Sequence, residues 1–216
     1  MNRIKLPVIF LFWFILYGCN SSFIRTTRIA QHESPGKYNK ILVVGIIKDE
    51  DLSLRSQIEK HLRDDLKESG YNAVTALEEF GPKGLANLGQ QETYIKLRNN
   101  GIDAVFTIAL IDKRKAKYHK PRHAHGYTSI YYFDRIWNYP AIQAELFNSK
   151  NPENKELFWE IILFDLNTLE PQYTVQTKSF KSGISENIIH EYGKQIISRM
   201  IKEKILMKQT NEAKSL

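Results

Sequence analysis

The chain has 216 residues, a formal net charge of +7 and a single cysteine. One cysteine excludes an internal disulfide, and the length suits one globular domain that can bury a core without disulfides or metals. The basic excess suits anionic partners, and the N-terminal sequence indicates which of them the chain meets.

The first eighteen residues, "MNRIKLPVIFLFWFILYG", have the layout of a secretory signal peptide. Arg3 and Lys5 form a short positive region, and every residue from 6 to 17 except Pro7 is apolar or aromatic. As a helix this run would span roughly 18–20 Å, which is short of the ~30 Å hydrocarbon core of a bilayer. We therefore predict a signal peptide over residues 1–18.

The end of this leader, Leu16-Tyr17-Gly18-Cys19, resembles the lipobox of bacterial lipoproteins. The resemblance implies cleavage before Cys19 and attachment of acyl chains such as palmitate to this residue. Tyr17 is larger than the residue usual at its position. Ordinary signal-peptidase cleavage after Ser21 and an uncleaved anchor are the alternatives. Three acyl chains exceed the two signals needed for stable membrane attachment, so we predict a lipid-anchored protein.

Asn20 stands where the enterobacterial sorting rule places aspartate for retention in the inner membrane. By this resemblance we expect the protein in the outer membrane, facing the periplasm. Export separates the chain from nucleic acid. Without its leader the chain carries a formal charge of about +5, which suits lipid head groups, an anionic envelope polymer or another envelope protein as partner.

Four regions follow from this pattern. The signal peptide covers 1–18, and the polar stretch 19–39 is predicted to be the lipidated cysteine and a flexible tether, because "ESPGKYN" punctuates its end. A single α/β domain is expected over 40–206. A polar C-terminal tail is expected over 207–216.

The domain opens with strands and helices in alternation. The apolar, β-branched run 40–47 predicts a buried strand, and Leu54, Ile58, Leu62 and Leu66 recur every four residues in a helix after it. A second strand is expected over 71–77, a helix over 87–101 and a third strand over 103–111. Strand, helix, strand, helix, strand at this spacing predicts a parallel sheet.

The second half of the domain has a different pattern. The runs 156–166 and 171–180 are separated by a short turn sequence, which predicts a hairpin. Residues 185–206 carry apolar side chains at helical spacing and predict a C-terminal helix. The fold class is therefore α/β with a mixed sheet, a βαβαβ parallel start followed by an antiparallel hairpin and a C-terminal helix.

These elements resemble a group of exported bacterial lipoproteins whose globular part is similar to the N-terminal domain of TolB and to the CsgG and LpoB type of periplasmic module. The markers are an Arg–Glu pair on the first helix (Arg55 and Glu59), Gly101 and Asp103 before the third strand, and Trp159 in a later strand. The resemblance implies a binding or assembly accessory, and it supplies no catalytic residues.

The stretch 112–140 holds the candidate binding residues. Its basic members would face an anion or a partner, and its aromatic members would add contact area. Three histidines in it are suited to zinc or copper, although the neighbouring cations oppose a divalent metal. The alternatives are a solvated hairpin and aromatic packing under the loop. The surface candidates are Lys113, Arg114, Lys115, Lys117, Lys120, Arg122, Tyr131 and Trp137, and the metal candidates are His119, His123 and His125.

No sequence pattern indicates an enzyme. The first strand is followed by one glycine and three carboxylates in place of a phosphate-binding loop, and there is no Gly-x-Ser-x-Gly. We therefore expect no catalysis and no cofactor. The predicted function is that of a lipid-anchored envelope accessory protein acting by non-covalent binding or assembly. The alternative is a small-molecule or metal-binding periplasmic module that uses the loop 112–125.

Overall fold

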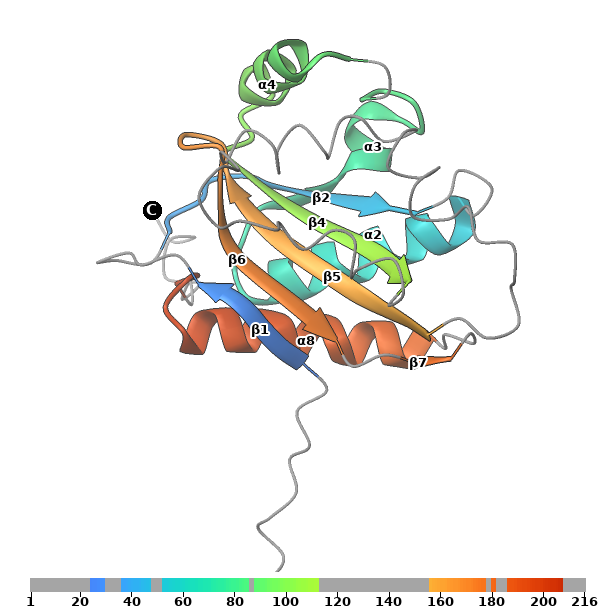
Figure 1. Ribbon diagram of the computed structural model, residues 1–216. Helices are drawn as coiled ribbons and strands as arrows, with labels where there is room; N and C mark the ends of the chain where they lie inside the picture. The colour runs from blue at the N-terminus through green and yellow to red at the C-terminus, as the bar shows by residue number, and fades with distance from the viewer. Residues whose placement is uncertain are drawn as a thin grey trace, which may run out of the picture.

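The computed structural model describes residues 24–29, 36–47, 52–85, 88–112, 156–177, 180–181 and 186–207. Within these ranges seven strands form one sheet in the order β1-β6-β5-β4-β2-β3, and β7 pairs with β5 (Figure 1). The sheet is mixed and carries helices on both faces. The predicted α/β class is confirmed.

The parallel half of the sheet consists of β2 (Ile41–Ile46), β3 (Ala73–Thr75) and β4 (Ala104–Asp112). β2 lies between the other two and pairs with both in parallel. All six residues of β2 are buried, which agrees with the continuous apolar run that predicts a strand covered on both faces.

The antiparallel half begins with β5 (Glu156–Asp165), which pairs with β4 along its length. β6 (Glu170–Thr177) follows after a short turn and pairs with β5, so the predicted hairpin is confirmed. The two-residue β7 (Phe180–Lys181) adds a short pairing to the start of β5.

An additional edge strand, β1 (Ile24–Ile29), pairs antiparallel with β6. It lies inside the range 19–39, for which the sequence predicts a flexible tether, so this part of the chain differs from the prediction. The polar sequence "IRTTRI" reads as a linker, yet four of its six residues are β-branched and suit an edge strand. Further on, Gly36 forms an isolated bridge with Leu206.

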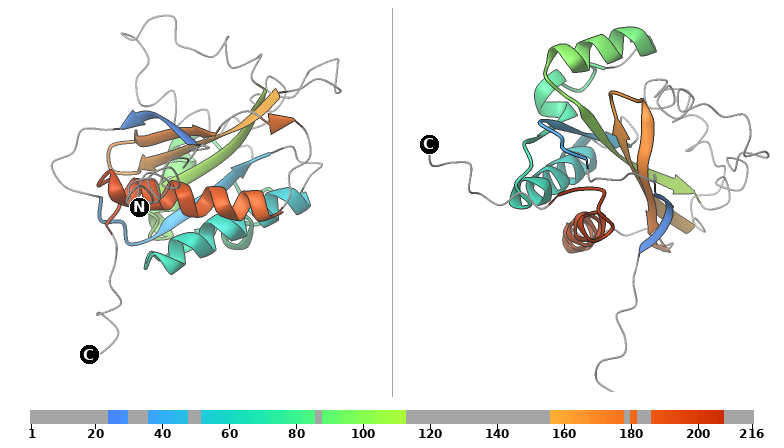
Figure 2. Two further views of the ribbon diagram at one scale, coloured as in Figure 1. Left: turned by 90° about the horizontal axis from the view of Figure 1, so that it is seen from below. Right: turned by 90° about the vertical axis from the view of Figure 1, so that its left-hand side faces the viewer.

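Two long helices cover one face of the sheet. These are α2 (Leu52–Glu68) and α8 (Glu186–Lys202), which lie side by side in Figure 2. Their apolar stripes bury the larger of two core clusters against the sheet. This cluster includes Ile58, Leu62, Leu66, Phe106, Trp159, Ile161, Tyr173, Ile196 and Met200.

The opposite face carries two shorter helices, α3 (Ala76–Phe80) and α4 (Gln90–Asn99). The sequence predicts a strand through residue 77, but β3 ends at Thr75. The Thr75 side chain accepts a hydrogen bond from the Glu78 backbone N–H at 3.1 Å, so it caps α3 and begins the helix. The second core cluster on this face includes Leu42, Val44, Leu97, Ile102, Val105, Phe158 and Phe164.

Three helices end in the same way, with a left-handed residue just past the end. Gly70 follows α2 with φ 93°, Gly101 follows α4 with φ 72°, and Lys204 follows α8 with φ 59°. In each, the next residue's N–H reaches back to the helix, as Ile205 does to the Met200 carbonyl at 2.8 Å. Lysine occupies a position that favours glycine, which makes the end of α8 strained.

The two long helices approach closely at one point. A Cβ atom at Gly193 of α8 would overlap Oδ2 of Asp65, which is buried in α2. Glycine therefore allows the backbone of α8 to pack directly against α2 at this position.

Candidate functional site

The candidate residues predicted from sequence lie outside the described ranges. This holds for Cys19, for the basic and aromatic candidates and for the three histidines. Among the described residues, no group of three or more His, Cys, Asp or Glu side chains is arranged to hold a metal ion. In the same part of the chain, no helix has the length and apolar character needed to cross a membrane.

The structure does show where the predicted binding stretch is attached. β4 ends at Asp112 and β5 begins at Glu156, and Asp112 pairs with Leu157. Both ends of residues 113–155 therefore start from one point, at the edge of the sheet where β4 ends. We call this side of the sheet the anchor edge. It is also the side at which β2 ends, where open α/β sheets bind ligands.

Charge is distributed unevenly between this stretch and the rest of the chain. Residues 113–155 carry nine Lys or Arg against three Asp or Glu. The described residues carry equal numbers of the two kinds, sixteen of each. The described domain is thus formally neutral, and the 113–155 stretch supplies most of the net positive charge of the protein.

A buried ion pair on α2 lies against β2. Arg55 Nε lies 2.9 Å from Glu59 Oε1, and the two side chains come from adjacent turns of α2. Glu59 is fully buried and Arg55 is nearly so. Oε1 of Glu59 also accepts the N–H of Gly45 at 2.9 Å, and Oε2 accepts the N–H of Leu77 at 3.0 Å.

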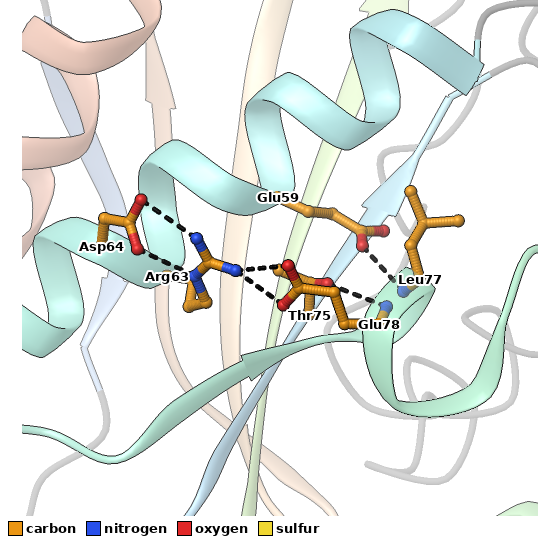
Figure 3. Close-up of polar contacts among 6 residues, drawn as sticks. All are labelled: Glu59, Arg63, Asp64, Thr75, Leu77 and Glu78. Carbon is orange, nitrogen blue, oxygen red and sulfur yellow. Dashed lines mark hydrogen bonds and ion pairs between the residues drawn. The ribbon is translucent and has the colours of Figure 1, made fainter.

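Each contact of Glu59 compensates for a break in regular structure. β3 ends before it reaches the level of Gly45, so the carboxylate replaces the strand partner that this amide would otherwise have. The Leu77 amide belongs to the first turn of α3, where backbone donors have no partner within the helix. Figure 3 shows the contact to α3 and the Arg63–Glu78 pair beside it.

Burial raises the pKa of Glu59 above its ordinary value, and the ion pair with Arg55 and the two amide donors act against this rise. All the contacts just described donate to the carboxylate, so they stabilise its ionised form. A buried group whose oxygens are already engaged is not placed to exchange protons with a substrate. The Arg55–Glu59 pair therefore has a structural role, because its contacts hold α2, β2 and α3 together.

The second marker, Gly101 and Asp103, joins the end of α4 to two strands. Gly101 takes the left-handed conformation that ends the helix. The carboxylate of Asp103 accepts the backbone N–H of Asn39 at 2.8 Å and that of Lys40 at 3.2 Å, which positions the start of β2. The backbone carbonyl of Asp103 accepts the N–H of Leu166 at 2.9 Å.

Trp159, the third marker, lies in β5 and is 2% exposed. It packs in the core beneath α2 and α8, and its backbone N–H donates to Thr177 Oγ1 at 3.0 Å. The three sequence markers therefore position helices and strands, and the structure gives them architectural roles. The contacts of Glu59 and Asp103 could not be predicted from local sequence patterns, and the two residues were named only through the family resemblance.

One polar hollow of about 300 Å³ lies at the opposite edge of the sheet, where β2 and β4 begin. Asp103 faces it with its contacts already made, and the remaining polar lining comes from Lys37, Asn39, Arg98 and Asn167. Neither Lys37 nor Arg98 takes part in an ion pair among the described residues, so two cationic side chains and the carboxylate of Asp103 line the hollow.

The fold defines the class of the protein as an α/β domain with one mixed sheet between two layers of helices. No protein-family model matches the chain, and no curated protein matches it. Among solved structures the chain is similar to two structures of the PelC dodecamer from Paraburkholderia phytofirmans. One is a point variant of PelC, and the other is PelC in a different crystal form. The TM-scores are 0.41 and 0.40 at 9% identity, over 81% of this chain and 96% and 94% of those chains. This similarity is too distant to assign a function.

Proposed function

We propose that the protein is a lipid-anchored accessory protein of the cell envelope, which acts by non-covalent binding and without catalysis. The anchor is Cys19, at the end of the predicted leader, and the expected location is the outer membrane facing the periplasm. The support for the anchor is the sequence of residues 1–19 and its resemblance to a lipobox.

The observation that carries the binding function is the attachment of the basic, aromatic residues 113–155 to a neutral domain at one edge. A concentrated positive charge accelerates encounter with an anionic partner, and the aromatic side chains contribute contact area. Because both ends of the stretch leave from adjacent strands, the domain acts as a rigid base that presents it. The partner is an envelope protein or an anionic envelope polymer.

The anchor is tested by labelling cells with radioactive palmitate. The wild-type chain should incorporate the label, and the Cys19→Ala variant should lose it. Incorporation that persists in the variant would contradict lipidation at this residue.

The binding surface is tested by crosslinking in intact envelopes. Changing Lys113, Arg114, Lys115 and Lys117 together to glutamine should reduce recovery of crosslinked partners at low salt and leave the melting temperature unchanged. A matched control removes the same charge from four exposed lysines of the described domain, Lys67, Lys83, Lys202 and Lys204. Equal recovery from the two variants at low and high salt would refute the proposed surface.

A further inference from the structure

The polar hollow is built from three connecting segments that the sheet brings together. Lys37 and Asn39 lie before β2, the residues from Arg98 to Asp103 join α4 to β4, and Asn167 lies in the turn between β5 and β6. These segments are distant in sequence, so the hollow exists only in the folded chain. Its volume of about 300 Å³ is at the lower end of the range of ligand sites, which suits a small ligand.

Hydrogen bonds fix the backbone around the hollow. The carboxylate of Asp103 accepts the backbone N–H of Asn39 at 2.8 Å, Nδ2 of the same residue at 3.1 Å and the N–H of Lys40 at 3.2 Å. The backbone carbonyl of Asp103 accepts the N–H of Leu166, which leads into the turn that carries Asn167. The three segments are therefore joined to one another without a ligand, and this reduces the ordering cost of binding.

Several polar side chains at the hollow keep hydrogen-bonding capacity that the protein does not use. Among the described residues, the side chains of Lys37, Arg98 and Asn167 make no hydrogen bond or ion pair. Lysine and arginine only donate, so they require acceptor oxygens from a ligand. Asn39 donates its Nδ2 to Asp103, which leaves its amide oxygen as an acceptor for a hydroxyl group.

The charge of the lining matches a monoanion. Lys37 and Arg98 supply two positive charges and Asp103 supplies one negative charge, so the formal sum is +1. A carboxylate balances this sum, and its two oxygens match the donor geometry of a guanidinium. A phosphate monoester carries about −1.5 to −2 near neutral pH, and its excess charge would be repelled by Asp103.

We propose that the hollow binds a small carboxylate that also carries hydroxyl groups, which is the chemistry of a sugar acid. Arg98 and Lys37 hold the carboxylate, and Asn39 and Asn167 hydrogen-bond the hydroxyl groups. The site goes beyond the proposed function, because it lies at the edge opposite to the attachment of residues 113–155 and does not depend on a lipid anchor. A cation at residue 98 also suits the C-terminus of α4 without any ligand, and the experiment separates these two roles.

Binding is tested on the full chain by saturation-transfer difference NMR, with glucuronate and galacturonate as probes. Glucose and glucose 6-phosphate are the comparison ligands. The sugar acids should bind with millimolar dissociation constants, because an open site of this size makes few contacts. Glucose should give no signal, and glucose 6-phosphate should bind more weakly than the sugar acids.

Three outcomes of this titration would overturn the proposal. Absence of binding by both sugar acids would remove the site. A signal from glucose equal to that from glucuronate would show that the carboxylate is not recognised. Tighter binding of glucose 6-phosphate than of either sugar acid would contradict the match to a monoanion.

The lining residues are tested by substitution. Arg98→Gln should weaken glucuronate binding about tenfold, and Asn167→Ala should weaken it several-fold. Both side chains are exposed, so the melting temperature should stay near that of the wild type. Lys60→Gln is the matched control, because it removes one exposed positive charge from the middle of α2, across the sheet from α4 (Figure 2). Equal dissociation constants for Arg98→Gln and Lys60→Gln would overturn the site and leave Arg98 with its role at the helix end alone.

Discussion

The buried pair of Arg55 and Glu59 yields the sharpest prediction. The substitution Arg55→Met removes the guanidinium and keeps an unbranched side chain of similar length. Glu59 would then remain fully buried without its cationic partner. The free energy of unfolding should fall, because a charge left unpaired in the interior is strongly unfavourable.

The size of this loss can be bounded from the contacts of Glu59. Removing one partner of a buried pair costs about 3–5 kcal/mol. Glu59 keeps the amide donors of Gly45 and Leu77 in the variant, which continue to stabilise its charge. We therefore expect a loss of about 3 kcal/mol, at the lower end of the range. Domains of this kind have about 5–15 kcal/mol in total, so the variant should still fold.

The loss should also depend on pH. Burial already raises the pKa of Glu59, and Arg55 opposes this rise, so the substitution should raise the pKa further. A carboxyl group whose pKa is higher in the folded state binds protons more readily there than in the unfolded chain. Its effect on stability becomes less favourable as pH rises through the interval between the two values. The variant should therefore recover part of its deficit on acidification from neutral pH.

The assay is urea denaturation followed by circular dichroism, at neutral pH and at about pH 5. Arg63→Met is the matched control on the same helix. Arg63 pairs with Asp64 and Glu78, whose side chains are about half exposed to solvent, so its loss should be about 1 kcal/mol or less. A loss below about 1 kcal/mol for Arg55→Met, or a deficit equal at the two pH values, would refute this reasoning.

Three further predictions concern other parts of the domain. Burial raises the pKa of Tyr71 to about 12, and its hydroxyl donates to the Met207 carbonyl. Its contribution is complete below about pH 10 and decreases as pH rises toward 12, so Tyr71→Phe should flatten the alkaline loss of circular dichroism. Lys204→Gly should relieve the left-handed end of α8 and add about 1 kcal/mol in urea denaturation, whereas Lys202→Gly inside the helix should lose about 1 kcal/mol. Asp103→Ala should cost about 1–3 kcal/mol and speed amide hydrogen exchange at the start of β2, while Asp103→Asn should cost less.

Local patterns in the sequence were sufficient for the main elements. The apolar run at 41–46 and the four-residue spacing of leucine and isoleucine in α2 depend on side chains a few residues apart. The same holds for the hairpin of β5 and β6 and for the last helix. The elements missed were the short or polar ones, β1 and α3. β1 is a strand by virtue of its pairing with β6, which lies about 150 residues away in the chain.

The sequence by itself determined the fold class, the order of the main helices and strands, and the position of a basic, aromatic stretch between β4 and β5. Arg55, Glu59 and Asp103 were named only as markers of a family resemblance. Only the tertiary structure decided what these side chains contact. Glu59 meets Gly45 and Leu77, and Asp103 meets Asn39, because strands and helices distant in sequence are brought together. Local periodicity does not encode such contacts, since they depend on strand order and on the register of the sheet.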